Sequence, residues 1–458
     1  MNTVRDSAGG DSRDEFYISL CLLEAMRGLG WTSPNPLVGC VIVRDGAVYA
    51  RGAHLEDGQA HAERNALLML SNADDAAAGR ITPGCAKGAT LYVNLEPCSH
   101  HGRTPPCTDA IIAAGVARVV YGDRDSDPRS AARARAVLEA AGIAVTGGVC
   151  EDECRRFNDK FHHLHARRYD LTDDRGSAPA RAFVAIKIAQ SLDGKIALAN
   201  GESKWITCPE SRARVHLLRQ AYDAVLIGAE TLRKDDPLLT ARTDVLAHGG
   251  IEIARPRDPI AIVVTKSGVL PANAKLFTEP RAPRAGTGII VAVPKVVIPS
   301  GIPSSAVVLD LPEAADGGID WLALFEKLPE YGIHSVLVEG GAGVWTSIIR
   351  AGAAARKDNH RGAETQERYS LPTCTAPIPG RDACASRDSH CAVDGFPDKY
   401  YIFIAPKIIG GDGKSAIDEL GVGALDPVSG TLDGATSLKN VRFESIGCDM
   451  LITGYGGQ

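Results

Sequence analysis

The sequence predicts an α/β fold that occurs twice along the chain. Short segments rich in Val and Ile alternate with segments whose apolar residues recur at helical spacing, the pattern of a sheet with helices on both faces. The chain has 458 residues, more than one ordinary core organises, so two or three domains are expected. A polar, charged stretch at 163–181 interrupts the alternation and is the expected linker.

The first α/β part is expected at residues 15–162, after a leader at 1–14 that we expect to be disordered. Asp45-Gly46 lies between two apolar runs within 36–54 and is a typical hairpin turn. Periodicity and bounding glycines predict the other elements. These are helices at 15–30, 61–70, 107–115 and 130–142, and strands at 88–95, 116–122 and 143–149.

The second part, residues 182–458, repeats the alternation. Its expected elements are strands at 182–189, 222–229, 259–265, 288–293, 306–311, 334–341 and 399–411, and helices at 321–328 and from Val344. A polar insert at 352–397 contains Cys374, Cys384 and Cys391. We expect this insert to be a flexible surface loop, because its composition is polar and its cysteines lack an obvious fourth metal ligand beyond His390.

The totals argue against several classes of function. A net charge of −6 and an aromatic content of 5% do not indicate a nucleic-acid or membrane-surface binder. No apolar run is long enough to span a membrane, and the first residues resemble no targeting signal. Twelve cysteines in such a chain are expected to be thiols and metal ligands, which favours a cytoplasmic location.

A histidine, a glutamate and two cysteines form a candidate catalytic metal site. His61 and Glu63 open one expected helix in "HAE", Cys98 ends "EPC" after a strand, and Cys107 opens another helix. Three N and S ligands suit zinc and leave one position for water. Glu63 is placed to move a proton between that water and a leaving amine.

The pattern departs from the usual H-x-E…P-C-x-x-C signature of zinc-dependent base deaminases. Eight residues, "SHHGRTPP", separate Cys98 from Cys107, where the signature has two. Each of these residues alone could be an ordinary core or surface residue. Their combination and order favour the metal site.

Three strings around these residues resemble one family. "TSPNPLVGCVIV", "GAHLEDGQAHAERNAL" and "GATLYVNLEPCSHHGRTPPCTDAIIAAGVARVV" are similar to the deaminase domain of the bifunctional riboflavin-biosynthesis deaminase/reductase family, in which the eight-residue spacing is typical. The resemblance implies a cytidine-deaminase-like three-layer domain with one zinc ion per chain. It also implies a phosphorylated ribosylaminopyrimidine as substrate, contacted by Asn35, His54, His100 and Arg103.

The second part carries a glycine-rich turn, Gly340-Gly341-Ala342-Gly343, between a strand and a helix. Such a turn can admit a phosphate, but it is not G-x-G-x-x-G, so a standard Rossmann domain is disfavoured. "KIAQSLDGKIALANGESKWIT", "LRQAYDAVLIGAETLRKDDPLLTAR", "VLVEGG" and "IAPKIIGG" resemble the reductase half of the same family. That half has a dihydrofolate-reductase-like fold and uses NADPH.

The resemblance assigns residues to both ligands of the reductase half. Lys187 and Asp235 lie where acid or base assistance is expected. The residues expected to face NADPH are Ala189, Trp205, Thr231, Asp235, Gly341, Ala342, Gly343, Val344, Trp345, Thr346 and Ser347. Those expected to face the substrate are Lys187, Ser203, Arg219, Leu239, Arg242 and Glu339.

Three alternatives remain open at this point: a chain with only one active domain, a nucleic-acid deaminase, and a non-catalytic nucleotide-binding or scaffold protein. The long loop and the acidic net charge disfavour the second, and the complete metal set with Glu63 disfavours the third. The expected partners are small phosphorylated pyrimidines, with no nucleic acid and no membrane. The resemblance is also compatible with a homo-oligomer.

Overall fold

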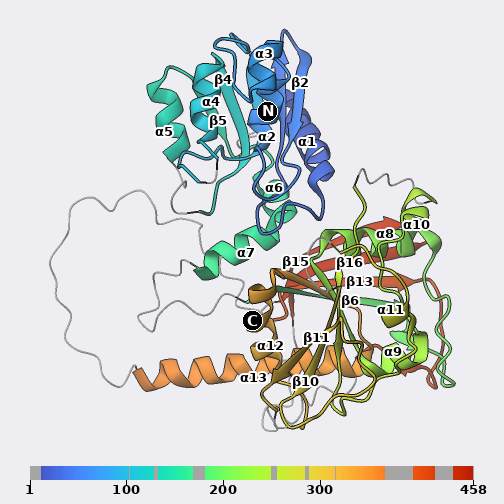
Figure 1. Cartoon of the computed structure of the whole chain (residues 1–458). Coiled ribbons are helices and arrows are strands. Elements are labelled where there is room, and N and C mark those ends of the chain that lie inside the picture. The colour runs from blue at the N-terminus through green and yellow to red at the C-terminus, as the bar shows by residue number, and fades with distance from the viewer. Residues whose placement is uncertain are drawn as a thin grey trace. The chain divides into compact units, whose positions relative to one another are not determined.

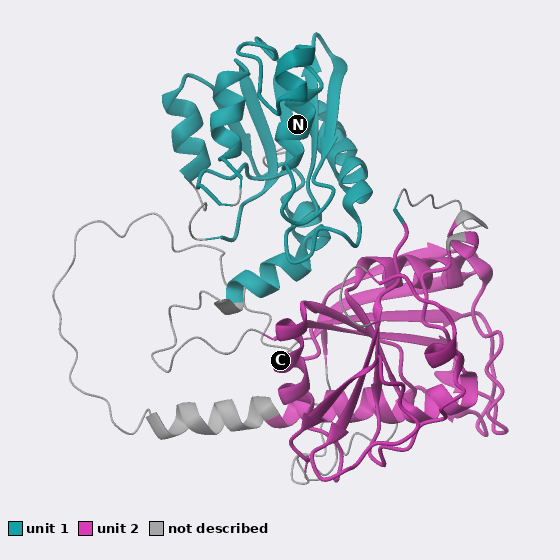
Figure 2. Ribbon diagram, in the orientation of Figure 1, with its two compact units in different colours: residues 1–179, 253–255 teal, residues 180–252, 256–458 magenta. Residues whose placement is uncertain are grey.

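The computed structural model describes residues 12–102, 104–127, 133–168, 181–248, 255–283, 288–314, 316–366, 396–417 and 437–456. The chain divides into two compact units, 1–179 with 253–255, and 180–252 with 256–458 (Figure 2). Each unit contains a large sheet with helices packed on it (Figure 1), which confirms the predicted α/β class. No described helix is long and apolar enough to cross a membrane.

The sheet of the first unit has the order β2-β1-β3-β4-β5. β1 is antiparallel to both of its neighbours, whereas β3, β4 and β5 are parallel. The expected hairpin turn is confirmed, because Asp45 (φ 52°) and Gly46 (φ 76°) are both left-handed, as the favoured two-residue turn requires. The strands are β1 Gly39–Arg44, β2 Ala47–Ala53, β3 Thr90–Leu95, β4 Arg118–Asp123 and β5 Ala144–Gly147.

Alternating strand residues divide the first unit into two cores. Cys40 and Ile42 of β1 pack with α2, α4 and α5, whereas Val41 and Val43 pack with α1 and α6 on the other face. The result is the three-layer arrangement expected from the sequence. The helices are α1 Ser12–Ala25, η1 Met26–Gly28, α2 Ala62–Leu68, α3 Ala73–Ala77, α4 Cys107–Ala113, α5 Arg133–Ala140, α6 Glu151–Phe157 and α7 Asp159–Arg168.

The second unit has a nine-stranded sheet with the order β11-β10-β9-β8-β12-β6-β13-β16-β15. Its first seven strands are parallel, and the hairpin β15–β16, which the sequence did not lead us to expect, adds two antiparallel strands. A separate pair joins β14 to β7. The strands are β6 Phe183–Ser191, β7 Lys195–Ala197, β8 Ala224–Gly228, β9 Ile260–Val264, β10 Ile289–Pro294, β11 Val307–Leu311, β12 Ser335–Val338, β13 Lys399–Ala405, β14 Lys414–Ser415, β15 Leu438–Ile446 and β16 Asp449–Gly456.

Helices cover both faces of this large sheet. Residues of α12 and α13 pack on one face, and residues of α8, α9 and α11 pack on the other. Both faces of the parallel strands are therefore buried, which explains their continuous apolar runs. The helices are α8 Pro209–Ala221, α9 Ala229–Asp235, α10 Thr243–His248, α11 Lys275–Thr278, α12 Trp321–Lys327, η2 Leu328–Tyr331 and α13 Ala342–Gln366.

Three segments that were expected to be irregular contain helix. α1 already begins at Ser12, and residues 1–11 of the expected leader lie outside the described residues. The linker expected from residue 163 begins later, because α7 continues to Arg168; residues 169–180 are likewise outside. The first part of the expected loop at 352–397 is helical instead, because α13 continues to Gln366.

The sequence explains why the start of the insert is helical. Residues 351–366 are rich in Ala, Arg, Lys, Glu and Gln, which are good helix formers as well as polar residues. The two ends of the insert lie side by side, because a methyl group built on Gly352 would lie only 2.0 Å from the carbonyl oxygen of Phe396. Cys374, Cys384 and Cys391 lie outside the described residues.

Candidate functional site

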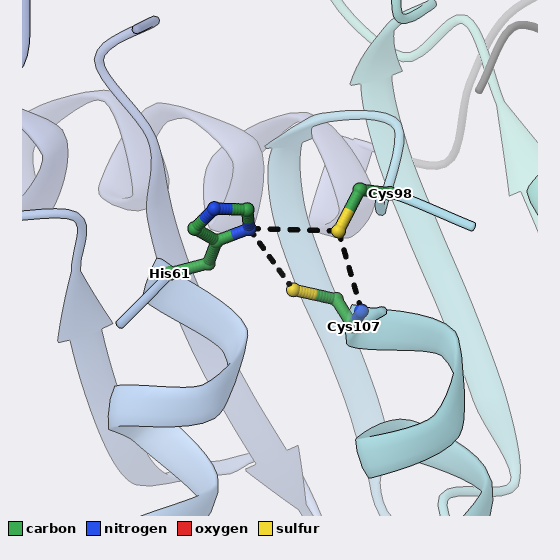
Figure 3. A group of neighbouring side chains, drawn as sticks. All are labelled: His61, Cys98 and Cys107. Carbon is green, nitrogen blue, oxygen red and sulfur yellow. Dashed lines mark hydrogen bonds between the residues drawn. The ribbon is translucent and has the colours of Figure 1, made fainter. Parts of the chain in front are cut away.

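The expected metal ligands of the first unit come together from three separate elements (Figure 3). His61 immediately precedes α2, Cys98 follows β3, and Cys107 is the first residue of α4. The Nδ1 atom of His61 lies 3.5 Å from Cys98 Sγ and 3.4 Å from Cys107 Sγ. The ligand atoms all lie within 4.8 Å of one another, close enough to surround one metal ion.

Electrostatics favour a thiolate within this group. The hydrogen bond from Cys107, together with that from His61, lowers the pKa of Cys98, and the amide of Cys107 also donates to Cys98 Sγ at 3.3 Å. Pairing with Cys98 raises the pKa of Cys107, and burial adds to this effect. The hydrogen bond with Cys98 raises the pKa of His61. Thiolate is the form in which cysteine binds a metal.

Glu63 lies beside the group, in the first turn of α2, and only 3% of the residue is exposed. Burial raises the pKa of its carboxyl group. Glu63, His61 and Cys98 all line one cavity of about 370 Å³. A buried carboxyl group and two of the expected metal ligands therefore line the same cavity, as hydrolytic deamination requires.

Three of the four expected substrate contacts, Asn35, His54 and His100, also line this cavity. His54 Nδ1 lies 3.1 Å from the carbonyl oxygen of Ala60, so it carries the proton, and Nε2 can accept from the Asn35 amide at 3.4 Å. Burial lowers the pKa of His54, consistent with a neutral ring. Arg103, the fourth, lies outside the described residues.

The cavity has a wall that the sequence analysis missed. Glu96 and Asp125 follow the parallel strands β3 and β4, and Phe161 and His165 come from α7. Asp127 completes this wall. The two strand ends were a usable signal, because ligands bind beyond the carboxyl ends of parallel strands. The α7 residues gave no comparable signal, since they belong to an ordinary amphipathic helix.

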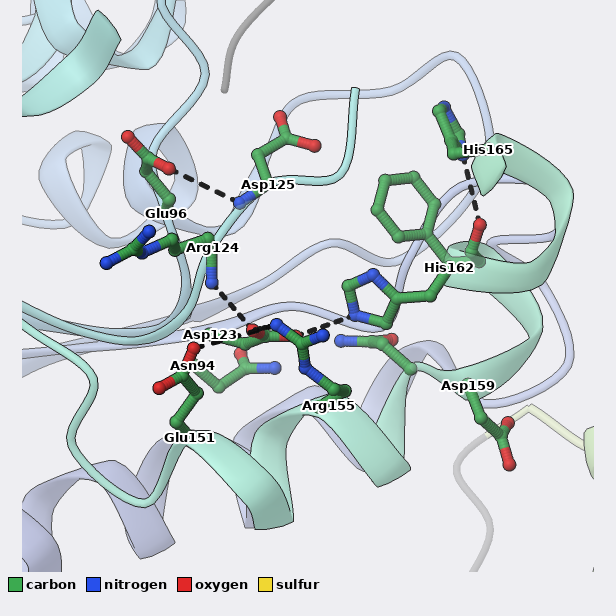
Figure 4. Close-up of polar contacts among 12 residues, drawn as sticks. Asn94, Glu96, Asp123, Arg124, Asp125, Glu151, Arg155, Asp159, His162 and His165 are labelled. Atoms are coloured by element: carbon green, nitrogen blue, oxygen red, sulfur yellow. Dashed lines mark hydrogen bonds and ion pairs between the residues drawn. The ribbon is translucent and has the colours of Figure 1, made fainter. Parts of the chain in front are cut away.

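A buried carboxylate fixes α7 in this position (Figure 4). Asp123, at the end of β4, is fully buried, accepts a hydrogen bond from Arg155 Nη2 at 3.0 Å and lies 2.8 Å from His162 Nε2. Arg155 belongs to α6 and His162 to α7. Both helices are therefore tied to the sheet next to the cavity, and α7 presents Phe161 and His165 to it.

In the second unit, three of the expected substrate residues form one partly buried ionic cluster. Glu339 follows β12 and accepts two hydrogen bonds from Arg219 of α8, at 2.6 and 3.0 Å. Lys187 Nζ of β6 lies 3.3 Å from the same carboxylate. Burial opposes ionisation of Glu339, but the attraction of Arg219 and Lys187 prevails and lowers its pKa to about 2.

This cluster also contacts the segment that contains Leu239 and Arg242. Arg219 Nη1 donates to the Thr240 carbonyl oxygen at 3.2 Å. His216 Nδ1 lies 3.1 Å from that oxygen and 3.2 Å from the amide nitrogen of Arg242. Leu239 is buried with a left-handed φ of 56°. Arg219 and His216 of α8 therefore hold this segment, and the sequence analysis missed His216.

The turn expected to face the cofactor stands at the start of α13. A methyl group built on Gly340 would lie 2.7 Å from Val344 Cβ, and one on Gly228 would lie 2.8 Å from Val344 Cγ2. Only glycines let the helix start so close to the ends of β8 and β12. The space beside Gly341 is open. The remaining residues of this turn are Ala342, Gly343, Trp345, Thr346 and Ser347, all within the first turns of the helix.

The other expected reductase residues are more dispersed. Trp205 is 63% exposed and stacks under the guanidinium of Arg212, 4.5 Å from the ring centre. Ala189 lies on β6, and Thr231 and Asp235 lie on α9. Among the described residues, no side-chain hydrogen bond or ion pair joins Ser203, Thr231 or Asp235 to the cluster of Glu339.

Two family models match the chain, one in each unit. Residues 11–123 match the cytidine and deoxycytidylate deaminase zinc-binding region, and residues 182–356 match the RibD C-terminal domain. The first range contains the whole group of His61, Glu63, Cys98 and Cys107. The second contains the cluster of Lys187, Arg219 and Glu339.

Relatives match along most of the chain or nearly all of it. Riboflavin biosynthesis protein RibD of Aquifex aeolicus is 32% identical over 96% of this chain and 97% of its own length. The protein of the same name from Escherichia coli is 37% identical over 74% of this chain and 85% of its own length. The solved structure of a diaminohydroxyphosphoribosylaminopyrimidine deaminase/5-amino-6-(5-phosphoribosylamino)uracil reductase from Thermotoga maritima matches with a TM-score of 0.65 at 29% identity, over 97% of this chain and 99% of that chain. The solved structure of Acinetobacter baumannii RibD, form 1, matches with a TM-score of 0.64 at 26% identity, over 98% of this chain and 99% of that chain. The chain therefore belongs to the RibD family of bifunctional riboflavin biosynthesis enzymes, with a deaminase domain followed by a reductase domain.

Proposed function

We propose that the two units catalyse consecutive steps on one phosphorylated pyrimidine. The first removes an amino group by hydrolysis from 2,5-diamino-6-ribosylamino-4(3H)-pyrimidinone 5′-phosphate. The second reduces the ribosyl chain of the product with NADPH, which gives 5-amino-6-ribitylaminouracil 5′-phosphate. The observation that carries the first step is the convergence of His61, Cys98 and Cys107, together with the cavity that His61 and Cys98 share with the buried Glu63.

The donor set of the first site fits zinc. One imidazole nitrogen and two thiol sulfurs within 4.8 Å of one another are ligands that zinc prefers, and three protein ligands leave a fourth position open. A zinc ion bound there would supply a water molecule of lowered pKa as the nucleophile. We assign to Glu63 the transfer of that water's proton to the departing amine, because its carboxyl group faces the same cavity.

The polar wall of the cavity suits the rest of this substrate. The neutral His54 and the Asn35 amide it contacts form a fixed pair that can hydrogen-bond to a pyrimidine edge. His100 lies on the loop between the two cysteines, where it can meet the ribose or the phosphate. This substrate class, a small phosphorylated pyrimidine rather than a nucleic acid, is part of the proposal.

The second unit offers groups for a reduction. An opened ribosyl imine must receive a hydride at C1′ and a proton at nitrogen, and NADPH would supply the hydride. The glycine turn at the start of α13 offers backbone amides to a cofactor phosphate, and the space beside Gly341 is open. Lys187 lies in the ionic cluster, 3.3 Å from Glu339, where its amino group can serve as the proton donor. Arg242 is exposed near that cluster and can bind the substrate phosphate.

A two-signal assay on the full, zinc-loaded chain tests both steps. With the diaminopyrimidinone phosphate and NADPH, we expect ammonia release and NADPH oxidation. In Glu63→Gln both signals should stop, and NADPH oxidation should return when 5-amino-6-(5-phosphoribosylamino)uracil is supplied directly. No ammonia from the unaltered chain would refute the deaminase assignment. Ammonia without NADPH oxidation, even with the second substrate supplied, would leave only the deaminase active.

A further inference from the structure

Two cysteine side chains of the second unit meet next to a carboxylate, and none of these residues belongs to the sites described above. Cys208 immediately precedes α8, and Cys448 lies in the turn between β15 and β16, next to Asp449. Their sulfur atoms and a carboxylate oxygen of Asp449 all lie within 4.8 Å of one another. The ligand atoms of His61, Cys98 and Cys107 meet the same spacing, so the two groups are comparably compact.

Hydrogen bonds already orient this group. Asp449 is 4% exposed, and its Oδ2 accepts the backbone amide of Cys208 at 2.7 Å. Its Oδ1 lies 3.5 Å from Cys448 Sγ, which donates to it. Cys208 Sγ donates to the carbonyl oxygen of Ile446 at 3.2 Å. The carboxylate is therefore fixed through one oxygen, while the other oxygen is held by a thiol proton that a metal ion can replace.

The turn between the two strands passes directly over these side chains. Gly447 has a left-handed φ of 56°, and a methyl group built on it would lie 2.9 Å from Cys208 Sγ and 2.6 Å from Glu210 Oε2. Any side chain at residue 447 would therefore displace both atoms. Glu210, exposed in the first turn of α8, brings a second carboxylate to the same place.

We propose that Cys208, Cys448 and Asp449 form a second metal site, for a thiophilic divalent ion of the zinc class. Two thiolates and one carboxylate are ligands that zinc accepts, whereas magnesium and calcium prefer sites built from oxygen alone. Glu210 or water completes the tetrahedron. Binding releases the two thiol protons and involves no oxidation. The ion joins the start of α8 to the β15–β16 turn, far apart in the sequence.

Zinc content per chain is the first test, measured on the full chain after dialysis against a zinc-buffering chelator. Cys448→Ser should bind one zinc ion fewer than the unaltered chain, and Cys107→Ser should independently lose the other. Cys448 is exposed in a turn, so the variant is expected to fold and to release ammonia at the unaltered rate. Cys85→Ser, which changes a partly buried thiol outside both groups, is the matched control and should lose none.

A spectroscopic test isolates the second site. In Cys98→Ser/Cys107→Ser the first site has no thiolates, so any thiolate-to-cobalt charge-transfer absorption on adding Co²⁺ alone must come from elsewhere. We expect that absorption, and its loss when Cys448→Ser is added. Equal zinc content in Cys448→Ser and the unaltered chain would overturn the proposal. So would a Cys208–Cys448 disulfide that forms in air while zinc is present.

Discussion

Arg181 and Asp398 form a buried, bidentate ion pair, although they are 217 positions apart in the sequence. The Nη1 and Nη2 atoms of Arg181 lie 2.6 and 2.7 Å from the two carboxylate oxygens, and the side chains are 2% and 0% exposed. Asp398 also accepts the amide of Val184 at 2.7 Å. The pair therefore holds the chain just before β6 against the chain just before β13.

We expect Asp398→Ala to destabilise the second unit strongly. The change leaves a buried guanidinium without its counter-charge, which typically costs about 3–5 kcal/mol. The free energy of unfolding of the full chain in urea, followed by tryptophan fluorescence, measures the effect. Asp316→Ala is the control, because Asp316 pairs with Lys266 at an exposed position and should cost less than about 1 kcal/mol. Similar losses in the two variants would contradict the structural role of Arg181.

Glu63→Gln should abolish ammonia release without removing zinc. The amide keeps the shape of the side chain but cannot accept and return a proton, so the rate should fall by about 10²–10⁴-fold or more. Zinc content should stay unchanged, because His61, Cys98 and Cys107 are intact. Glu139→Gln, which changes an exposed carboxylate on α5, should leave the rate unaltered. Ammonia release in Glu63→Gln at the unaltered rate would exclude Glu63 as the proton carrier.

The metal group could be predicted from sequence because its signals are local. Each ligand lies next to the end of a helix or strand. The order and spacing of "HAE", "EPC" and Cys107 can therefore be recognised in the sequence before the fold is known. The Asp45-Gly46 turn was predictable for the same reason, since its left-handed φ angles are a property of two adjacent residues. Such signals do not depend on which strands become neighbours.

The missed features depend on contacts between distant segments. In the sequence, Arg181 is one of several charged residues in a polar linker. Its partner Asp398 comes next to it only because β6 and β13 are neighbours in the sheet. His165 reaches the deaminase cavity only because the buried Asp123 fixes α7. The start of the insert is helical although its composition is polar, because the same residues have high helix propensity. Neither composition nor periodicity reports such long-range neighbours.

The ionisation of Glu339 should contribute to stability in a defined pH range. Its folded pKa of about 2 lies below its usual 4.5, so the folded state favours the ionised form. That contribution is complete above pH 4.5 and is lost as the pH falls toward 2. The shift corresponds to stabilisation on the order of 3 kcal/mol.

The comparison of Glu339→Gln with the unaltered chain tests this. The difference in unfolding free energy should be largest above pH 4.5 and should shrink toward pH 2, because protonation of Glu339 then removes the same charge. Reduction should also be impaired, since Lys187 and Arg219 lose their common partner. Glu330→Gln changes an exposed carboxylate paired with Lys327 and should show neither effect. A pH-independent difference for Glu339→Gln would show that the charge is not its cause.

His216 should affect how well the reductase binds its substrate rather than how fast it reacts. Burial lowers the pKa of His216 to about 4, so the ring is neutral at pH 7 and contacts the backbone of Thr240 and Arg242. His216→Phe keeps a ring in place but removes these polar contacts, which frees the segment that carries Arg242. We expect KM for 5-amino-6-(5-phosphoribosylamino)uracil to rise roughly fivefold, the equivalent of one hydrogen bond of about 1 kcal/mol, with kcat little changed.

The unaltered chain and His216→Phe should also differ in how stability depends on pH. Because the folded pKa of His216 is about 4 and its ordinary value is 6.5, the unfolded chain binds a proton first as the pH falls. The histidine therefore lowers the unfolding free energy progressively between pH 6.5 and 4. This part of the decline should be absent in the Phe variant. A fall in kcat with KM unchanged would instead place His216 in the chemical step. The same pH profile in both chains would mean that folding does not lower the pKa of His216.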